Sequence, residues 1–207
     1  MANANLLEIS RFLIAGLPVV IPTDTVLGLA MMVTASGDPQ ILFTIKDRPV
    51  DKSIPWLIGS LDDLDTYTSG LPDWALSMAE RFWPGALTLV CRASSAVPPA
   101  FAAPDGSIAL RMPNHPLALE LLHTLAAPLA CTSANISGQE PVSRVSELDP
   151  RIAGRVAGVL DDSGYGPPGQ ALPSTIVSCL GDGPEVLRKG DLTLDELLSG
   201  LRQQERP

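Results

Sequence analysis

The sequence predicts an α/β fold of the α+β type, with a twisted mixed β-sheet and helices packed against it. Short apolar runs typical of strands and longer stretches with helical spacing both recur along the chain. They do not alternate strictly, and several strand-like runs follow one another directly, which favours a mixed sheet over a regular doubly wound one. With 207 residues, 45% of them hydrophobic, the chain can bury a sizeable core. We therefore expect one domain spanning residues 1–207.

The helices are predicted from their capping residues and apolar spacing. Asn5 and Glu8 have the spacing of a capping box, and Gly16 can end the helix that they begin. Thr193 and Glu196 repeat the capping-box spacing before a last helix. The other predicted helices are one opened by Asp38-Pro39 and running to residue 45, a short acidic one after Ser60, and residues 71–83 and 114–125.

The strands are predicted from short apolar runs bounded by turn residues. Residues 18–21 have the composition of a buried strand, and residues 86–91 alternate weakly between apolar and polar. The full predicted set covers residues 18–21, 28–33, 54–58, 86–91, 107–111, 128–131, 156–160, 174–178 and 185–187.

Charge and cysteine content exclude several classes of function. A net charge of −9 argues against a broad nucleic-acid-binding face, although it leaves room for a small basic cleft. Cys91, Cys131 and Cys179 are few and widely spaced, and His115 and His123 are the only imidazoles, so we expect no metal site and no disulfide framework. The N-terminal residues make a poor signal peptide, and no apolar run could span a membrane, so we expect a soluble, cytoplasmic protein.

The segment IKDRPVDK gathers Lys46, Arg48 and Lys52 within seven residues. These cations could be the solvated end of a helix, where the helix dipole favours positive charge. They could also neutralise a polyphosphate, because Arg offers a bidentate fork and Lys a point charge. The segment alone slightly favours the helix end.

Other polar residues stand where predicted strands end. Arg111 and Arg188 could be surface ion-pair partners or could hold a ligand carboxylate. In the segment CTSANISG, Ser133 and Asn135 could cap a helix or line a ligand site at a strand end. Thr25 with an exposed Asp24, Ser174 at a strand edge, and a buried Cys131 each have an ordinary structural interpretation as well.

Taken together, these motifs resemble a known family. PTDTVLGLA, KDRP, WPGALTLV, ALRMP, TSANISG, STIV and LR-x-G stand here in the order and spacing of the YrdC-like family, whose members are threonylcarbamoyl-AMP synthases. The resemblance covers roughly residues 5–200. Its most specific part, the paired signature KxR…SxN, falls on Lys46, Arg48, Ser133 and Asn135.

The resemblance implies a sheet folded around a basic cavity and a synthase that condenses L-threonine, bicarbonate and ATP, with Mg²⁺ accompanying the ATP. The product would serve tRNA modification through downstream transfer proteins, with no tight tRNA binding by this chain. By position, the signature residues Lys46, Arg48, Ser133 and Asn135 are implied to be catalytic. The implied ATP contacts are Arg48, Lys52, Ser107, Ser133 and Arg188, and the implied threonine contacts are Thr25, Arg111, Cys131 and Ser174.

Two features depart from the family pattern. Some relatives carry a threonine-contacting histidine where this chain has Leu57, and many have a second domain, whereas this chain resembles the short single-domain form. Two rival functions remain at this point: an RNA-binding module with the same fold, and a relative that has lost synthase activity. The acidic charge weighs against the first, and the intact signature weighs against the second.

Overall fold

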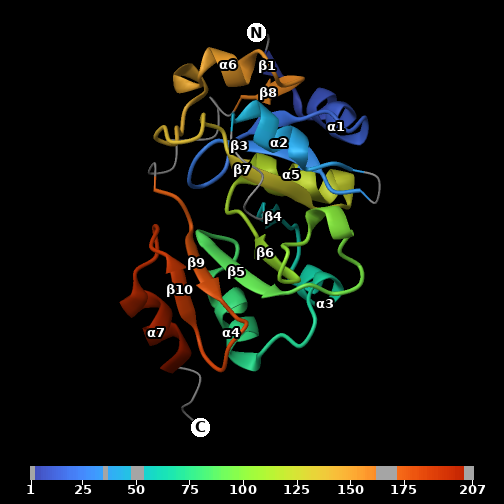
Figure 1. The fold of residues 1–207 in the computed structure, drawn as a ribbon. Helices are drawn as coiled ribbons and strands as arrows, with labels where there is room; N and C mark the ends of the chain where they lie inside the picture. The colour runs from blue at the N-terminus through green and yellow to red at the C-terminus, as the bar shows by residue number, and fades with distance from the viewer. Residues whose placement is uncertain (1–2, 35–36, 48–53, 162–171, 203–207) are drawn as a thin grey trace.

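A computed structural model describes residues 3–34, 37–47, 54–161 and 172–202 of the chain (Figure 1). The strands of these residues form one mixed sheet in the order β1-β8-β2-β3-β7-β4-β6-β5-β9-β10. The strands are β1 (Asn3–Ala4), β2 (Val19–Ile21), β3 (Gly28–Met32), β4 (Trp56–Leu57), β5 (Leu87–Arg92), β6 (Ser107–Arg111), β7 (Leu129–Ser133), β8 (Gly158–Leu160), β9 (Thr175–Ser178) and β10 (Glu185–Arg188).

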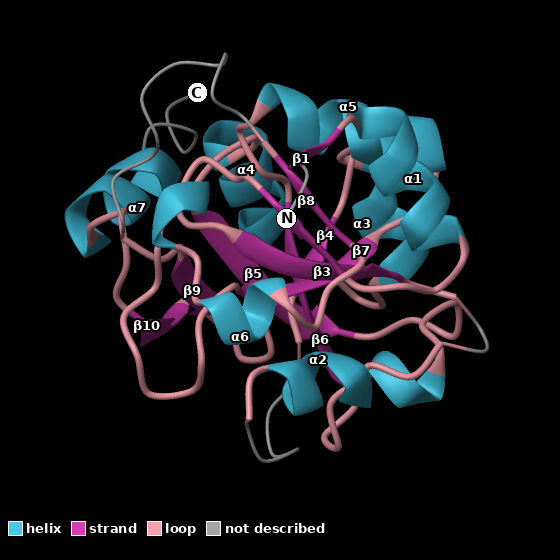
Figure 2. Cartoon of the chain, turned by 90° about the horizontal axis from the view of Figure 1, so that it is seen from above, coloured by secondary structure: helices cyan, strands magenta, loops and turns pink. Residues whose placement is uncertain are grey.

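The helices pack on both faces of this sheet. They are α1 (Leu6–Ile14), α2 (Gln40–Ile45), α3 (Asp62–Tyr67), α4 (Asp73–Phe82), α5 (Pro116–Leu125), α6 (Pro150–Ala153) and α7 (Leu194–Arg202). Buried residues of α1 and α5 form one core with one face of β2, β3 and β7, and the remaining helices contribute to a larger core on the other face. Figure 2 shows α1 and α5 on one side of the central strands and α2 and α6 on the other. The predicted mixed sheet with flanking helices is confirmed.

Each predicted strand has a counterpart, but several boundaries differ. The strand predicted at residues 128–131 continues through Ser133, because Thr132 and Ser133 still pair with Leu29 and Gly28 of β3. The strand predicted at residues 54–58 shrinks to two residues, since Pro55 has no N–H to extend the ladder. Strand β1 and helix α6 were missed, because elements of two and four residues are too short to show a period.

The predicted capping boxes are both present. The amide of Glu8 donates to the Asn5 side chain at 3.0 Å, and the amide of Asn5 donates to the Glu8 carboxylate at 3.0 Å. At the other end of the chain, the Thr193 amide donates to the Glu196 carboxylate at 2.8 Å. Ser60, which we expected to cap the short acidic helix, precedes the N-cap of α3, which is Leu61; its hydroxyl accepts from the amide of Asp62.

The alternation of side chains along β5, β6 and β9 produces an open, polar face. Leu87, Leu89 and Leu110 point into the core that α4 and α7 cover. Thr88, Ser107 and Arg111, one residue out of phase, point to the opposite face, as the strand period of two requires. The polar face lines a cavity.

Among the described residues, no helix is long and apolar enough to cross a membrane.

Candidate active site

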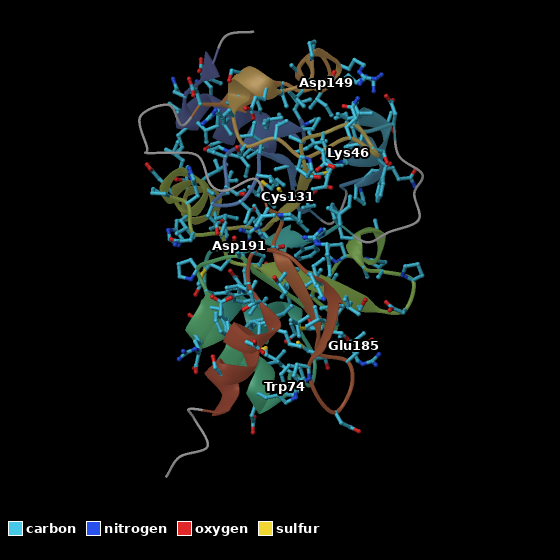
Figure 3. The ribbon with its side chains drawn as sticks, turned by 90° about the vertical axis from the view of Figure 1, so that its left-hand side faces the viewer. Lys46, Trp74, Cys131, Asp149, Glu185 and Asp191 are labelled. Atoms are coloured by element: carbon cyan, nitrogen blue, oxygen red, sulfur yellow. The ribbon has the colours of Figure 1, made fainter. Side chains whose placement is uncertain are left out.

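The cavity on this face has a volume of about 1060 Å³. Its walls come from strands β3 to β7 and from the hairpin of β9 and β10, so residues far apart in sequence meet there. Figure 3 shows Cys131 near the middle of the molecule and Glu185 below it; both residues line the cavity. The cavity is large enough for a nucleotide together with a small second substrate.

Arg111 lies buried at one end of the cavity and is held by three different partners. Its Nε donates to the carbonyl of Gly85 at 2.9 Å, its Nη1 donates to the Thr25 hydroxyl at 2.8 Å, and its Nη2 donates to an Asp24 oxygen at 2.6 Å. A guanidinium group has five N–H donors, so two remain beyond these bonds. The planar fork is therefore fixed in place before any ligand arrives.

A second arginine stands near the first. Arg188 donates to the carbonyl of Ser174 through Nη2 at 2.8 Å, and the same nitrogen lies 3.1 Å from the Ser174 hydroxyl. That hydroxyl also shares a hydrogen bond of 2.7 Å with Thr88. Desolvation, and then the positive charge of Arg111, lower the pKa of Arg188 below its ordinary value. Two like charges brought together at one cavity favour an anionic ligand.

The floor between these groups is small and apolar. Cys131 is buried there, and burial raises the pKa of its thiol to about 12, so the sulfur is a neutral thiol at physiological pH. A Cβ atom on Gly28 would lie 2.5 Å from the Cys131 sulfur, so only glycine fits beside it. Leu57 completes this part of the lining. The backbone N–H of Cys131 donates to the Pro55 carbonyl at 2.8 Å and is not available to a ligand.

Lys46 of the KxR…SxN signature meets Ser133 and Asn135 in the structure. Lys46 is buried just beyond α2, and its Nζ donates to the carbonyls of Ser133 and Asn135, the latter at 2.7 Å. The Asn135 side chain accepts from Nζ at 3.2 Å and donates to the Gln139 carbonyl at 2.6 Å. Lys46 thus braces the loop after β7. Ser133 lines the cavity, whereas Lys46 and Asn135 stand behind its wall.

The remaining predicted residues divide into two groups. Arg48 and Lys52 lie outside the described residues. Thr25, Ser107, Arg111, Cys131, Ser174 and Arg188 all line the same cavity. The Ser107 hydroxyl donates to Asp105 at 2.7 Å, and this bond, with a second from the Ser107 amide, lowers the pKa of Asp105. Whether these residues bind substrates stays a prediction.

The charge of the cavity is mixed over the described residues. Arg111 and Arg188 line it, but so do the carboxylates of Asp105 and Glu185. The predicted basic character therefore depends on Arg48 and Lys52 and stays a prediction. Asp24 corrects the sequence interpretation: expected as an exposed turn residue, it is largely buried and pairs with Arg111, with 16% of its side chain exposed. Nothing local signals this contact, because the partners lie 87 residues apart.

Comparisons with known proteins place the chain in a family. The family model Sua5_yciO_yrdC, described as "Telomere recombination", matches residues 11–190. The chain is 35% identical over 181 residues to a Bacillus subtilis protein named threonylcarbamoyl-AMP synthase, covering 86% of this chain and 51% of that protein. A Pyrococcus abyssi protein of the same name is 32% identical over 186 residues, covering 90% of this chain and 54% of its own length.

Solved structures agree as well. The structure of Pyrococcus abyssi Sua5 complexed with L-threonine has a TM-score of 0.85 and 30% sequence identity, covering 94% of this chain and 56% of that one. Escherichia coli YciO, at 23% identity and a TM-score of 0.81, shares the fold. The chain spans about half the length of the two synthases that it matches.

Proposed function

The chain belongs to the Sua5_yciO_yrdC family, and from this premise we propose that it is an L-threonylcarbamoyladenylate synthase. It condenses L-threonine, bicarbonate and ATP to threonylcarbamoyl-AMP and pyrophosphate. The product is passed to downstream proteins that modify tRNA with threonylcarbamoyladenosine. The observation that carries the proposal is that two arginines line one cavity and each is hydrogen-bonded to a hydroxyl residue, Arg111 to Thr25 and Arg188 to Ser174. Two relatives that bear the name of this activity support it.

The threonine end of the cavity is the one built around Arg111. Two guanidinium N–H groups left over from its protein partners can donate to the two oxygens of an amino-acid carboxylate. The hydroxyls of Thr25 and Ser174 supply further hydrogen-bonding groups, and Cys131 and Leu57 supply an apolar floor for a short side chain. The relative solved with L-threonine bound supports an amino acid of this size.

We assign Ser107, Ser133 and Arg188, which line the same cavity, to the nucleotide, with Arg188 where the two substrates meet because it also bonds Ser174. Hydroxyls and a guanidinium group suit phosphate oxygens, and Arg188 lies close enough to Arg111 for their charges to interact. We assign Arg48 and Lys52, which follow α2 directly in sequence, to the same phosphates. Lys46 and Asn135 act behind the wall by holding residues 133–137, the end of β7 and the turn after it, which we call the Ser133 loop.

The chemistry needs alignment and charge neutralisation more than a nucleophilic side chain. The threonine nitrogen adds to the bicarbonate carbon, which gives a carbamate and water. A carbamate oxygen then attacks the α-phosphorus of ATP, and the bond to the bridging oxygen breaks as pyrophosphate leaves. Fixed cations such as Arg188 can offset the charge that develops on the leaving group. The neutral thiol of Cys131 is a poor nucleophile and is not required by this route.

Magnesium fits this site as a companion of ATP. The described residues hold no group of three His, Cys, Asp or Glu side chains that could bind a metal ion. Mg²⁺ commonly keeps substrate phosphates and water as most of its ligands, so a dedicated protein cage is not needed. Asp105 and Glu185 are the carboxylates among the described residues that line the cavity, and the lowered pKa of Asp105 keeps it ionised, so we assign Asp105 a share of the ion. Bound there, the ion would neutralise triphosphate charge.

The proposal is tested by incubating the purified protein with ATP, bicarbonate and labelled threonine. We expect labelled threonylcarbamoyl-AMP and an equal amount of pyrophosphate, and both should disappear when threonine or bicarbonate is left out. L-serine as the substrate in place of L-threonine is a matched control, because it lacks the methyl group that the apolar floor of Cys131 and Leu57 would contact. Equal pyrophosphate release with and without threonine would contradict the assignment. Tight tRNA binding without any adenylate would favour the RNA-binding module.

A further inference from the structure

We propose that Arg155 is a positioning residue for this site, acting through the end of α2 and Lys46 on the loop that carries Ser133. In what it says about ATP, the inference rests on the proposed function. Its structural part, that Arg155 holds Lys46 and the Ser133 loop in place, stands without it. Arg155 does not line the cavity, so any effect it has must pass through other residues.

Arg155 follows α6 and reaches across to the C-terminus of α2. Its Nη1 donates to the Asp47 carboxylate at 2.8 Å and to the Ile45 carbonyl at 3.0 Å, and lies 3.4 Å from the Thr44 carbonyl. The last carbonyls of a helix have no partner within the helix and carry partial negative charge. Arg155 therefore caps α2 although it lies 110 residues after Ile45, the last residue of that helix.

The residue after Lys46 has a left-handed backbone conformation. Asp47 has a φ of 51°, in the left-handed region that L-residues other than Asn, Asp and Gly rarely adopt. This turn ends α2 and sets the direction in which the chain leaves Lys46. The Asp47 side chain is the one that Arg155 binds. One contact thus holds both the left-handed turn residue and the helix end next to it.

Lys46 passes this constraint to the cavity wall. Its carbonyl accepts from the Ser137 amide at 2.9 Å, and its Nζ donates to the carbonyls of Ser133 and Asn135. Backbone and side chain of Lys46 therefore both grip the loop after β7. If α2 shifts at its end, these bonds shift with it, and Ser133 is the member of the group that faces the cavity.

The Arg155–Asp47 ion pair is exposed, so its effect on the site can be distinguished from an effect on folding stability. The side chains of Arg155 and Asp47 are 43% and 49% exposed. Ion pairs this exposed contribute little to the stability of a fold. Loss of Arg155 should therefore leave the folded protein intact while loosening the geometry of the Ser133 loop. A displacement of about 1 Å near a reacting phosphate can cost about a hundredfold in rate.

The experiment compares Arg155→Gln with Arg155→Lys, Asp47→Asn and a control, Arg144→Gln. Arg144 is also an exposed arginine in an ion pair, with Glu147 at 3.8 Å. Hydrogen exchange without substrates should be faster in Arg155→Gln over residues 42–47 and 133–137, and unchanged there in Arg144→Gln. Asp47→Asn keeps a residue tolerant of positive φ but loses the charge, so it should resemble Arg155→Gln, and the double variant should add little more.

The kinetic arm measures adenylate formation against ATP and threonine separately. Arg155→Gln should raise the ATP requirement by roughly tenfold and leave the threonine requirement unchanged, with Arg155→Lys in between. Unchanged exchange over residues 133–137, or equal kinetic losses in Arg144→Gln, would overturn the proposal. If the wild-type protein makes no adenylate, the proposed function fails, and the exchange comparison still decides whether Arg155 holds this loop.

Discussion

Replacing Arg111 by lysine separates the threonine end of the cavity from the nucleotide end. The variant keeps one positive charge but replaces a planar fork with a single nitrogen. Arg111 donates in three directions, to Gly85, Thr25 and Asp24, at 2.9, 2.8 and 2.6 Å. A lysine Nζ cannot reach all three, and pairing with Asp24 turns it away from the carboxylate of a substrate. We expect the KM for threonine to rise and the KM for ATP to change by less than about twofold. A twofold change is much smaller than the tenfold that corresponds to about 1.4 kcal/mol.

The magnitude follows from the bonds that are lost. A hydrogen bond to a charged group contributes about 1.5–3 kcal/mol, which corresponds to a rise of about ten- to 150-fold in the threonine KM. The Gly85 carbonyl also loses its donor, at about 1–3 kcal/mol of folding stability, or a Tm lower by about 2–12 °C for a chain of this length. Initial rates of adenylate formation at varied threonine and varied ATP measure the first effect, and thermal melts the second. Arg144→Lys is the surface control. A variant altered only in its ATP dependence would refute the threonine role of Arg111.

Further predictions concern Lys46, Cys131 and the binding of tRNA. Lys46→Met should lower folding stability by about 1–3 kcal/mol for each buried carbonyl that loses its charged donor. The activity losses of Lys46→Met and Ser133→Ala should not be additive. Thermal melts measure the change in stability, and a double-mutant cycle measures the additivity. Cys131 should react with iodoacetamide about a thousandfold more slowly in the native than in the unfolded protein at pH 8, as peptide mapping would show, because its pKa is about 12 rather than 9.0. Since that pKa is raised on folding, the stability it contributes is complete below pH 9 and is lost as the pH rises towards 12; a Cys131→Ala variant should lack this loss. Filter binding to tRNA at physiological salt should give no tight complex, given the net charge of −9; sub-micromolar binding would contradict this.

The sequence predicted the local elements well and the contacts between them poorly. Capping boxes such as that of Asn5 and Glu8 were found because both partners lie within one turn. The two-residue strand β1 pairs with β8 from the far end of the chain, and nothing in its own residues could have indicated that partner. The same limit applies to the site. Motif resemblance selected Arg111 and Ser174, which line the cavity, but it did not indicate the contacts of Asp24 and Arg155, whose partners are distant in sequence.

The resemblance also left roles open that the structure now separates. Lys46 and Ser133 were grouped as one site, and they do meet, but only Ser133 faces the cavity. A sequence motif shows which residues occur together, but it does not show which of them line the cavity and which lie behind its lining. Burial decides that, because a lysine with 3% exposure and carbonyl partners around its Nζ is committed to the protein interior.

The separations of the bonded partners have a consequence for how the protein is made. Thr25 and Arg111 lie 86 residues apart, as do Thr88 and Ser174, and Lys46 and Ser133 lie 87 apart. Contacts this distant in sequence are slow to form, because a long loop must close before they give any stabilisation. Strand β9, which carries part of the cavity, pairs with β5 only after residue 178 has been synthesised. A ribosome adding about 5–20 residues per second therefore exposes the first half of the sheet for several seconds before its pocket can close. During that interval the nascent chain has no complete site that a substrate could stabilise.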